Sequence, residues 1–306
     1  MELITSLARA IEKSEPDTLN LVLSAPYRYR RYTIPKRTHG RRLIAQPTKE
    51  IKAVQKAFVK IRTFPIHPAA MAYRKGVSIK DNAQAHKLNS YLLKMDLTDF
   101  FNSITPSVFW RVWEKVWPLP ERLEMLLIER IIFWSNEDEL MLSVGAPSSP
   151  VVSNFCMYFF DDYISTLCDQ FDLVYTRYAD DLTFSTNKTN LLFEMPSIVG
   201  AVLKTEFNDF LAINKSKTIY SSKAHNRHIT GITITNNNEL SIGREKKRYI
   251  KHLVHQHLVC KLSIEDSNHL RGLLSFVSHI EPTFIKSLKN KYSEETIDKL
   301  LRGSYE

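Results

Sequence analysis

The segment DLVYTRYADDLTFS, residues 172–185, decides the fold. Apolar and β-forming residues stand on both sides of a short Ala179-Asp180 connection, which is typical of a β-hairpin. The hairpin would place Asp180 and Asp181 side by side at its tip. Carboxylates supply the hard oxygen ligands that Mg²⁺ prefers. The segment therefore predicts an acidic hairpin that binds metal.

A second acidic segment, KMDLTDFFNSI, lies upstream at residues 94–104. Residues 91–96 are typical of a buried strand that ends at Asp96, although Asp is also common at helix and turn caps. On a neighbouring strand, Asp96 and the hairpin pair would form a cluster of like charges that is costly unless a cation fills it. Such a cluster can hold two Mg²⁺ ions, which activate an attacking 3′-hydroxyl and neutralise a leaving pyrophosphate. This predicts a template-directed nucleic-acid polymerase.

A further pair of adjacent carboxylates, Asp161-Asp162, falls in a stretch that is typical of a helix. With 25% charged residues, a chain of 306 residues is expected to contain about one such pair by chance. We expect this pair to face water.

The two acidic segments resemble the metal-binding motifs of reverse transcriptases, and more narrowly those of the bacterial retron reverse transcriptases. YADD, residues 178–181, is similar to the family's catalytic box, and DLTDFF, residues 96–101, is similar to its other metal-binding box. The resemblance extends over nearly the whole chain. It implies that Asp96, Asp180 and Asp181 are the catalytic residues and that they bind two Mg²⁺ ions.

The resemblance also implies an α+β right-hand polymerase fold with fingers, an antiparallel-sheet palm and a helical thumb. N-terminal helices and fingers would occupy residues 1–90, the catalytic palm with interleaved fingers elements 91–243, and a thumb that binds RNA or the duplex 244–306. We expect three helices in the thumb. The palm sheet would be built from β-rich segments near 91–96, 172–186, 217–220 and 228–242.

Six residues are implied to contact the incoming nucleotide. Phe101 would be the aromatic gate that clashes with a ribose 2′-hydroxyl and so selects deoxynucleotides, although core packing also explains an aromatic residue there. Arg donates to phosphate oxygens bidentately, and Lys acts as a point charge. Gly145, in the loop GAPSSP, would let the backbone approach a ligand closely. The implied nucleotide-binding residues are Lys36, Arg42, Asp99, Phe101, Gly145 and Lys217.

The residue before this glycine departs from the family pattern. Val144 stands where the family commonly has Gln. Valine cannot make the hydrogen bond to a bound nucleotide that glutamine can make, so fidelity, nucleotide affinity or substrate pose would differ.

Two motifs favour the retron group. NAQAH, residues 82–86, fits the retron pattern ahead of the first metal box, and ITG, residues 229–231, stands where retron enzymes usually carry Val-Thr-Gly. The resemblance implies that they contact RNA, whereas helix capping or packing is the alternative for the histidine. The basic helix after Gly243 would grip the duplex, although charge runs are usually solvated helix faces. The implied RNA-binding residues are Asn82, His86, Ile229, Thr230, Gly231, Arg244, Lys247 and Arg248.

The charge balance fits a nucleic-acid partner. The chain carries 42 basic and 33 acidic residues, a formal net charge of +9, although a basic chain is also common in proteins that bind no nucleic acid. Acidic residues concentrate between residues 96 and 172, and basic residues flank them. YRYRRY, residues 27–32, interleaves cations with aromatic rings, which suits phosphate contact with base stacking, or alternatively an exposed edge strand.

The sequence carries no signal for a membrane or for secretion. It has no run of 18 apolar residues, and it opens with MELITSLARA, without a basic signal-peptide start. Cys156, Cys168 and Cys260 show no metal-binding spacing and are typical of reduced thiols. We expect a cytoplasmic protein that does not contact a membrane.

The resemblance implies an RNA-directed DNA polymerase that binds a structured noncoding RNA and primes from a guanosine 2′-hydroxyl. Its product would be branched, RNA-linked single-stranded DNA, or msDNA. Its partners would be that RNA, the msDNA, dNTPs, a separate effector protein in anti-phage defence, and host ribonuclease H, because no acidic cluster of the ribonuclease H kind follows residue 230. Two alternatives stay open. One is another bacterial reverse transcriptase, of the intron-related or abortive-infection type, and the other is an RNA-binding scaffold that restrains a toxic partner.

Overall fold

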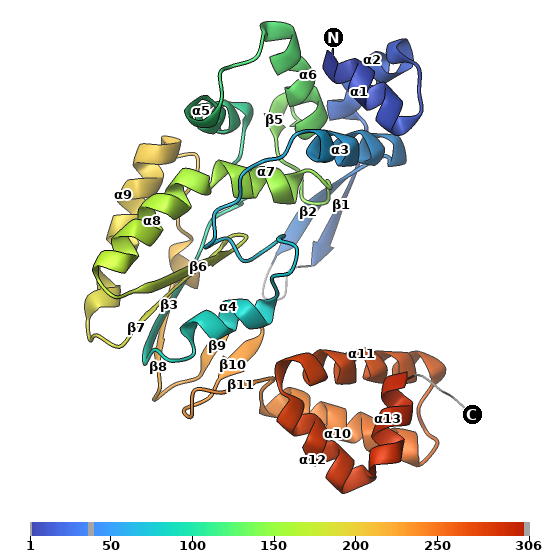
Figure 1. Ribbon diagram of the computed structural model, residues 1–306, viewed down its shortest axis with the longest axis vertical. Coiled ribbons are helices and arrows are strands. Elements are labelled where there is room, and N and C mark those ends of the chain that lie inside the picture. Colours follow the sequence, from blue (N-terminus) through green and yellow to red (C-terminus); the bar gives the residue numbers. More distant parts are fainter. Residues whose placement is uncertain (1, 36–39, 303–306) are drawn as a thin grey trace. The chain divides into compact units, whose positions relative to one another are not determined.

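The computed structural model describes residues 2–35 and 40–302 (Figure 1). Its chain forms two compact units, each drawn from two separate stretches of sequence. The first unit contains Met1–Gly76 and Leu93–Ile219, and the second contains Val77–Leu92 and Tyr220–Glu306. The division of the chain into fingers, palm and thumb at residues 90 and 243 remains a prediction. Lys36, which was predicted to bind the nucleotide, lies outside the described residues.

The first unit combines helices with strands. The helices are α1 (Glu2–Ile11), α2 (Glu15–Ser24), α3 (Lys49–Ile61), α5 (Pro106–Val116), α6 (Arg122–Ile132), α7 (Ser149–Cys156), α8 (Tyr158–Gln170) and α9 (Met195–Phe207). The strands are β1 (Tyr29–Pro35), β2 (Arg41–Pro47), β4 (Trp134–Asn136), β5 (Glu139–Met141), β6 (Val174–Tyr178) and β7 (Asp181–Thr186). Two further strands, β3 (Tyr91–Asp96) and β8 (Ile219–Ser222), begin in one unit and end in the other.

The central sheet has the strand order β6-β7-β3-β8. Strands β6 and β7 form the predicted antiparallel hairpin, with Tyr178 opposite Asp181. Helix α8 packs on β6 and leads directly into it (Figure 1). Strand β3 lies beside β7, so the strand that ends at Asp96 neighbours the strand that begins at Asp181.

The fourth β-rich segment, 228–242, was wrongly assigned to this sheet. It forms a separate three-stranded sheet of order β11-β10-β9 in the second unit, built from β9 (Arg227–Ile229), β10 (Ile232–Ile234) and β11 (Leu240–Ser241). The reason is that its apolar residues are buried among the apolar side chains of the C-terminal helices. Those partners are distant in sequence, so periodicity alone does not reveal them.

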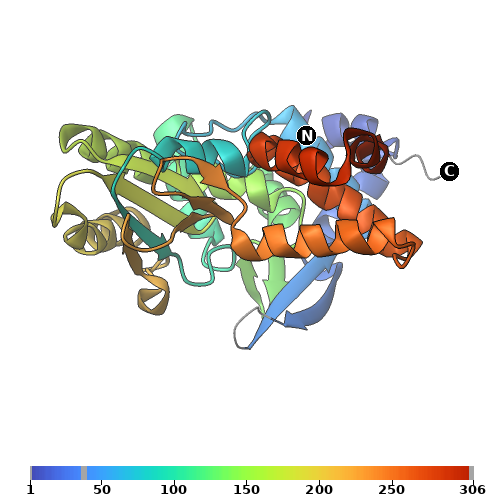
Figure 2. The ribbon, with the colours of Figure 1, turned by 90° about the horizontal axis from the view of Figure 1, so that it is seen from below.

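The rest of the second unit is helical. Helix α4 (Ile79–His86) packs against β10 and β11. The C-terminal helices are α10 (Arg244–Leu258), α11 (Ile264–Ile280), α12 (Pro282–Tyr292) and α13 (Glu294–Arg302), with α11, α12 and α13 packed together (Figure 2). There are four where three were predicted, because Ser293 takes the left-handed φ of +81° and its hydroxyl accepts from the Thr296 amide, which starts a new helix.

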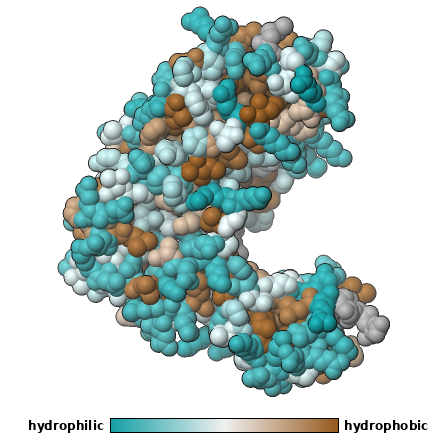
Figure 3. Space-filling model, viewed as in Figure 1, coloured by the Kyte–Doolittle hydropathy of each residue, from teal (hydrophilic) through white to brown (hydrophobic). Residues whose placement is uncertain are grey.

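On the face in Figure 3 much of the surface is hydrophilic, with separate apolar patches. None of the helices among residues 2–35 and 40–302 has the length and apolar character needed to cross a membrane.

Candidate active site

The tip of the β6–β7 hairpin is pinned to the end of β3. Ala179 and Asp180 form the two-residue turn, and Ala179 takes a left-handed φ of +58°. The amide of Leu97 donates to the carbonyl of Asp180 at 3.0 Å. Because Leu97 follows Asp96 directly, this bond brings the third predicted carboxylate to the hairpin tip.

Asp96 also contacts the segment that carries Lys217. The Asn214 amide donates to the Asp96 carbonyl at 2.7 Å. The Lys217 ammonium donates to both carboxylate oxygens of Asp96, at 2.9 and 2.8 Å. The structure therefore joins Lys217, predicted from an isolated motif, to the carboxylates.

Water exclusion and mutual repulsion raise the pKa values of the hairpin carboxylates. The pKa of Asp180 is raised first by burial and then by the Asp96 carboxylate. The pKa of Asp181 is raised to about 6, by desolvation first and then by Asp180 and Asp96, although its side chain reaches solvent. Both shifts mean that the ionised carboxylates are disfavoured, first by burial and then by mutual repulsion, and a bound cation would offset both effects.

The donor set of this cluster fits a divalent metal. It offers carboxylate oxygens, which Mg²⁺ prefers over nitrogen or sulfur. Among residues 2–35 and 40–302, no three acidic, histidine or cysteine side chains already converge at metal-binding spacing. In this arrangement Lys217 supplies positive charge at Asp96. Residues Asp96, Asp180 and Asp181 are the ones that would hold a metal.

A buried ion pair supports the hairpin from beneath. The Arg177 guanidinium donates to Asp161 at 2.6 to 3.1 Å, and the Tyr175 hydroxyl donates to the same carboxylate at 2.8 Å. Arg177 also donates to the carbonyl of Ala179 in the turn at 3.1 Å. Both charged side chains are fully buried. The prediction that the Asp161-Asp162 pair faces water was wrong for Asp161, because this long-range partner was not visible in the sequence.

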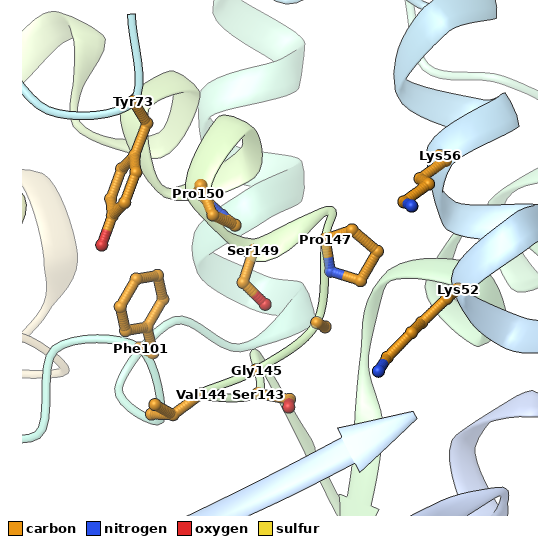
Figure 4. Close-up of a pocket in the computed structure, with 11 residues that line it drawn as sticks. Lys52, Lys56, Tyr73, Phe101, Ser143, Val144, Gly145, Pro147, Ser149 and Pro150 are labelled. Carbon is orange, nitrogen blue, oxygen red and sulfur yellow. The ribbon is translucent and has the colours of Figure 1, made fainter. Parts of the chain in front are cut away.

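A pocket lies beside the predicted aromatic gate (Figure 4). Its volume is about 280 Å³. The rings of Tyr73 and Phe101 lie 6.4 Å apart, centroid to centroid. Gly145 has a φ of +121°, and an added Cβ would lie 3.4 Å from the carbonyl oxygen of Ala45. The pocket is lined by Lys52, Lys56, Tyr73, Phe101, Ser143, Val144, Gly145, Ala146, Pro147, Ser149 and Pro150.

Strand register separates two neighbouring arginines on β2. Arg41 pairs with Pro35 across the ribbon, and its guanidinium donates to the Thr33 hydroxyl at 2.6 Å. Arg42 is one residue on, so its side chain lies on the opposite face. Burial and Asp96 raise the pKa of Asp180, and the positive charge of Arg42 opposes that rise. The field of Arg42 therefore reaches the carboxylates. Asp99 is exposed in the turn after β3, with a φ of +41°.

Replacing Arg42 with Ala should raise the KM for deoxynucleoside triphosphates roughly 10- to 100-fold, because hydrogen bonds to charged groups contribute about 1.5–3 kcal/mol. Arg41→Ala is the matched control, since it removes the same charge from the other face. Steady-state primer extension with varied nucleotide concentration measures both. Equal KM changes in the two variants would contradict the assignment of Arg42 to the nucleotide side.

The predicted RNA-contacting motifs of the second unit lie mostly inside it. Asn82 and His86 on α4 are buried, as is Ile229. The Asn82 amide nitrogen donates to the Thr230 hydroxyl at 3.5 Å, so the two motifs meet. Gly231 follows with a φ of +87°. RNA contact by these residues remains a prediction, and what the structure gives them is a packing role.

The basic residues of α10 differ among themselves. Arg244 and Arg248 are exposed. Lys247 forms an ion pair with Glu281, whose carboxylate also accepts from the Ser241 hydroxyl and the Ile242 amide. The two arginines are therefore the more available of the three for a phosphate backbone, and RNA binding by all three remains a prediction.

Replacing His86 with Gln should flatten the acid dependence of stability. Burial lowers the pKa of His86 to about 3, whereas an unfolded histidine has a pKa of about 6.5. Between these values only the unfolded chain binds the proton, so wild-type stability falls as pH drops below about 6.5, by up to about 1.4 kcal/mol per pH unit. Urea unfolding at pH 7 and pH 5 measures the difference.

The control for this prediction is His279→Gln, because His279 is exposed on α11. That variant should keep the wild-type loss of stability between pH 7 and pH 5. If His86→Gln also kept the full loss, the titration of His86 would not be its cause.

Three residues beside the carboxylates were not predicted from the sequence. Lys94 lies two residues before Asp96 and so on the same face of β3. Burial lowers the pKa of Lys94, and the negative charge of Asp181 opposes that shift. That spacing could have identified Lys94. Arg177 directly precedes the YADD motif, but its role depends on a distant helix. Tyr73 has a left-handed φ of +61° in a loop without a periodic pattern, and no sequence signal marks it.

The family model and the similar curated proteins are all reverse transcriptases. The family model for reverse transcriptase (RNA-dependent DNA polymerase) matches residues 34–234. The chain is 46% identical to the retron Ec83 reverse transcriptase of Escherichia coli, with 96% of each chain covered. It is 32% identical to the retron Ec86 reverse transcriptase of the same organism, covering 92% of this chain and 88% of that protein.

Among solved structures, a telomerase of Candida albicans in complex with a fragment of telomeric RNA matches with a TM-score of 0.49 and 12% identity. The match covers 91% of this chain and 61% of that one, so this chain spans less than two thirds of the telomerase chain.

Proposed function

This chain belongs to the retron reverse transcriptases, which are RNA-directed DNA polymerases with an α+β right-hand polymerase fold, and we propose that it makes msDNA. In this proposal it binds one structured noncoding RNA and begins synthesis at a guanosine 2′-hydroxyl of that RNA. It then copies the adjoining segment into single-stranded DNA that stays branched to the RNA. The observation that carries the polymerase chemistry is the meeting of Asp96 with the Asp180-Asp181 hairpin tip.

The metal proposal follows from the charge of that cluster. Asp96, Asp180 and Asp181 would hold two Mg²⁺ ions, because they offer clustered oxygen donors whose pKa values are raised for Asp180 and Asp181, first by burial and then by the neighbouring carboxylates. When bound, the ions supply activation of the attacking hydroxyl and neutralise the leaving pyrophosphate.

The remaining residues of the site would position the nucleotide. Arg42 and Lys217 both supply positive charge to the carboxylates, which suits a triphosphate. Phe101 would stand against the sugar, and the positive φ of Gly145 lets the backbone approach the nucleotide. Asp99 would lie beside the triphosphate from its exposed turn.

Partners follow from the proposed reaction. Arg244, Lys247 and Arg248 would contact the RNA or duplex, with Thr230 and Gly231 next to the buried Asn82 and His86. The noncoding RNA, its msDNA, dNTPs and a separate anti-phage effector would form the working system in the cytoplasm. Host ribonuclease H would remove the copied template.

The test is co-expression of the chain with its flanking genomic DNA, followed by gel analysis of small nucleic acids with and without ribonuclease and debranching enzyme. We expect a short DNA that shifts on debranching and is absent from the Asp180→Asn/Asp181→Asn double variant. If wild type yields no such DNA but extends an ordinary annealed primer, the priming proposal falls and the polymerase activity stands.

A further inference from the structure

Tyr73 has a backbone conformation that its own side chain disfavours. Its φ is +61°, in the left-handed region, where a bulky residue crowds the backbone. Its side chain is 47% exposed, so core packing does not explain the conformation. Strain of this kind persists only where the surrounding structure over-determines it, and it gathers at functional sites. The conformation of Tyr73 therefore indicates a functional role for its ring.

Two long-range hydrogen bonds fix the chain immediately before Tyr73. The Met71 amide donates to the Arg177 carbonyl at 2.7 Å, which joins this segment to the outer edge of β6 in the catalytic hairpin. The side-chain amide of Asn154, on α7, donates to the Ala72 carbonyl at 2.9 Å. Because both partners belong to regular elements, the backbone before Tyr73 has little freedom to relax. These bonds hold the Tyr73 ring in one place relative to the hairpin.

The Tyr73 ring lies against the proposed gate. Its centroid is 6.4 Å from that of Phe101, and the two planes make an angle of 52°, which is within the range that aromatic pairs favour. Figure 4 shows the two rings together at one end of the pocket. Burial raises the pKa of Tyr73 and the negative charge of Asp180 raises it further, so the hydroxyl lies within the field of the carboxylates. Tyr73 is thus next to the gate and close to the reaction centre.

A steric gate rejects a ribonucleotide only if its ring cannot move aside. The clash with a 2′-hydroxyl is short-ranged, so a small displacement of the ring would relieve it. Phe101 lines a pocket of about 280 Å³, which offers room for such a displacement. Phe100 packs beside Phe101 from the same turn, whereas Tyr73 approaches from a separate segment that is fixed independently. Tyr73 is therefore placed to keep the gate ring from rotating away.

We propose that Tyr73 is a positioning residue that holds Phe101 against the sugar of the incoming nucleotide and so sets how strongly the enzyme rejects ribonucleotides. The inference rests on the proposed gate role of Phe101 and adds to it the residue that keeps the gate in place. Tyr73 acts through Phe101 rather than on the reacting atoms. Its loss therefore changes the choice between the two sugars more than the rate of synthesis with deoxynucleotides.

The test measures incorporation of one deoxynucleotide and of the matching ribonucleotide on an ordinary annealed primer and template. The readout is the ratio of the two kcat/KM values, here called the sugar ratio. We expect Tyr73→Ala to lower the sugar ratio roughly 3- to 10-fold, the size of one aromatic pair interaction. Tyr73→Phe keeps the ring and should keep the wild-type ratio. An unchanged ratio in Tyr73→Ala, or an equal loss in Tyr73→Phe, would overturn the inference.

Two further variants separate the role of the ring from that of the strained backbone. Tyr73→Gly removes the ring and also relieves the positive φ, so it should melt no lower than Tyr73→Ala and lose the sugar ratio to the same extent. Tyr163→Ala is the matched control, because it removes a 56% exposed tyrosine ring from α8. It should keep the wild-type ratio. A wild-type ratio in Tyr73→Gly would show that the ring does not position the gate.

Phe101→Val distinguishes a failure of this inference from a failure of the proposed gate. If Phe101→Val lowers the sugar ratio and Tyr73→Ala does not, the gate stands and the inference falls. If Phe101→Val leaves the ratio unchanged, the gate itself is contradicted, and the inference falls with it. Because Tyr73 acts through Phe101, Tyr73→Ala/Phe101→Val should lower the ratio no further than Phe101→Val alone. A further loss in the double variant would overturn the positioning role.

Discussion

Replacing Asp180 and Asp181 with Asn should abolish DNA synthesis, with a loss of at least about 1000-fold in rate. Metal-ion catalysis contributes several kcal/mol of transition-state stabilisation, and each 1.4 kcal/mol is a factor of ten. The two side chains share the hairpin tip with Asp96 close by, so the amides remove most of the anionic donor set. Primer extension by purified protein measures the loss.

The same double variant should melt at a higher temperature than wild type when metal is absent. The pKa of Asp181 is raised to about 6, above its unfolded value near 4, so wild type without metal loses stability as pH rises from about 4 to 6. Neutral amides do not carry this repulsion. Added Mg²⁺ should then raise the melting temperature of wild type and leave that of the variant unchanged.

The control for both measurements is Asp169→Asn, which removes an exposed carboxylate from α8. It should leave synthesis and the response to Mg²⁺ at wild-type levels. Retained synthesis in the double variant would overturn the catalytic assignment of the hairpin.

Replacing Arg177 with Met should destabilise the protein by about 3–5 kcal/mol, the usual cost of leaving a buried charge without its partner. Asp161 is fully buried and accepts from Arg177 and Tyr175, so loss of Arg177 leaves its carboxylate charge buried without a cation. Denaturant unfolding measures the loss. Lys188→Met is the control, because its ion pair with Asp172 is exposed and such pairs contribute about 0–1 kcal/mol.

A second variant separates stability from positioning. Arg177→Met/Asp161→Leu removes both buried charges, and such replacements are often neutral or stabilising. We expect the double variant to recover much of the stability but not the synthesis rate, because the Ala179 carbonyl still lacks its guanidinium donor. Full recovery of synthesis would show that Arg177 only supports the core.

The sequence predicted the parts of the site that depend on local pattern. The YADD hairpin and the strand that ends at Asp96 are confirmed, because alternating β-formers and a two-residue turn specify them within a few residues. Lys217 came from a motif resemblance, and its contact with Asp96 could not be derived from spacing.

What escaped prediction depends on contacts between distant segments. Asp161 has the sequence context of a solvated carboxylate, and only the fold brings Arg177 to it from β6. The segment 228–242 alternates like a palm strand, yet its apolar side chains pack with the C-terminal helices. Ser149 belongs to a loop motif whose residue types explain a close backbone approach, but only the folded chain shows a hydroxyl left without a partner.

The interleaving of the two units also sets an order of events during translation. Every residue of the first unit has been synthesised once Ile219 is made. Helix α4, made much earlier, must wait for β10 and β11 before its buried face is covered. Domains generally fold as units while the chain emerges. The catalytic hairpin can therefore mature on the ribosome while α4 still lacks the strands that cover it.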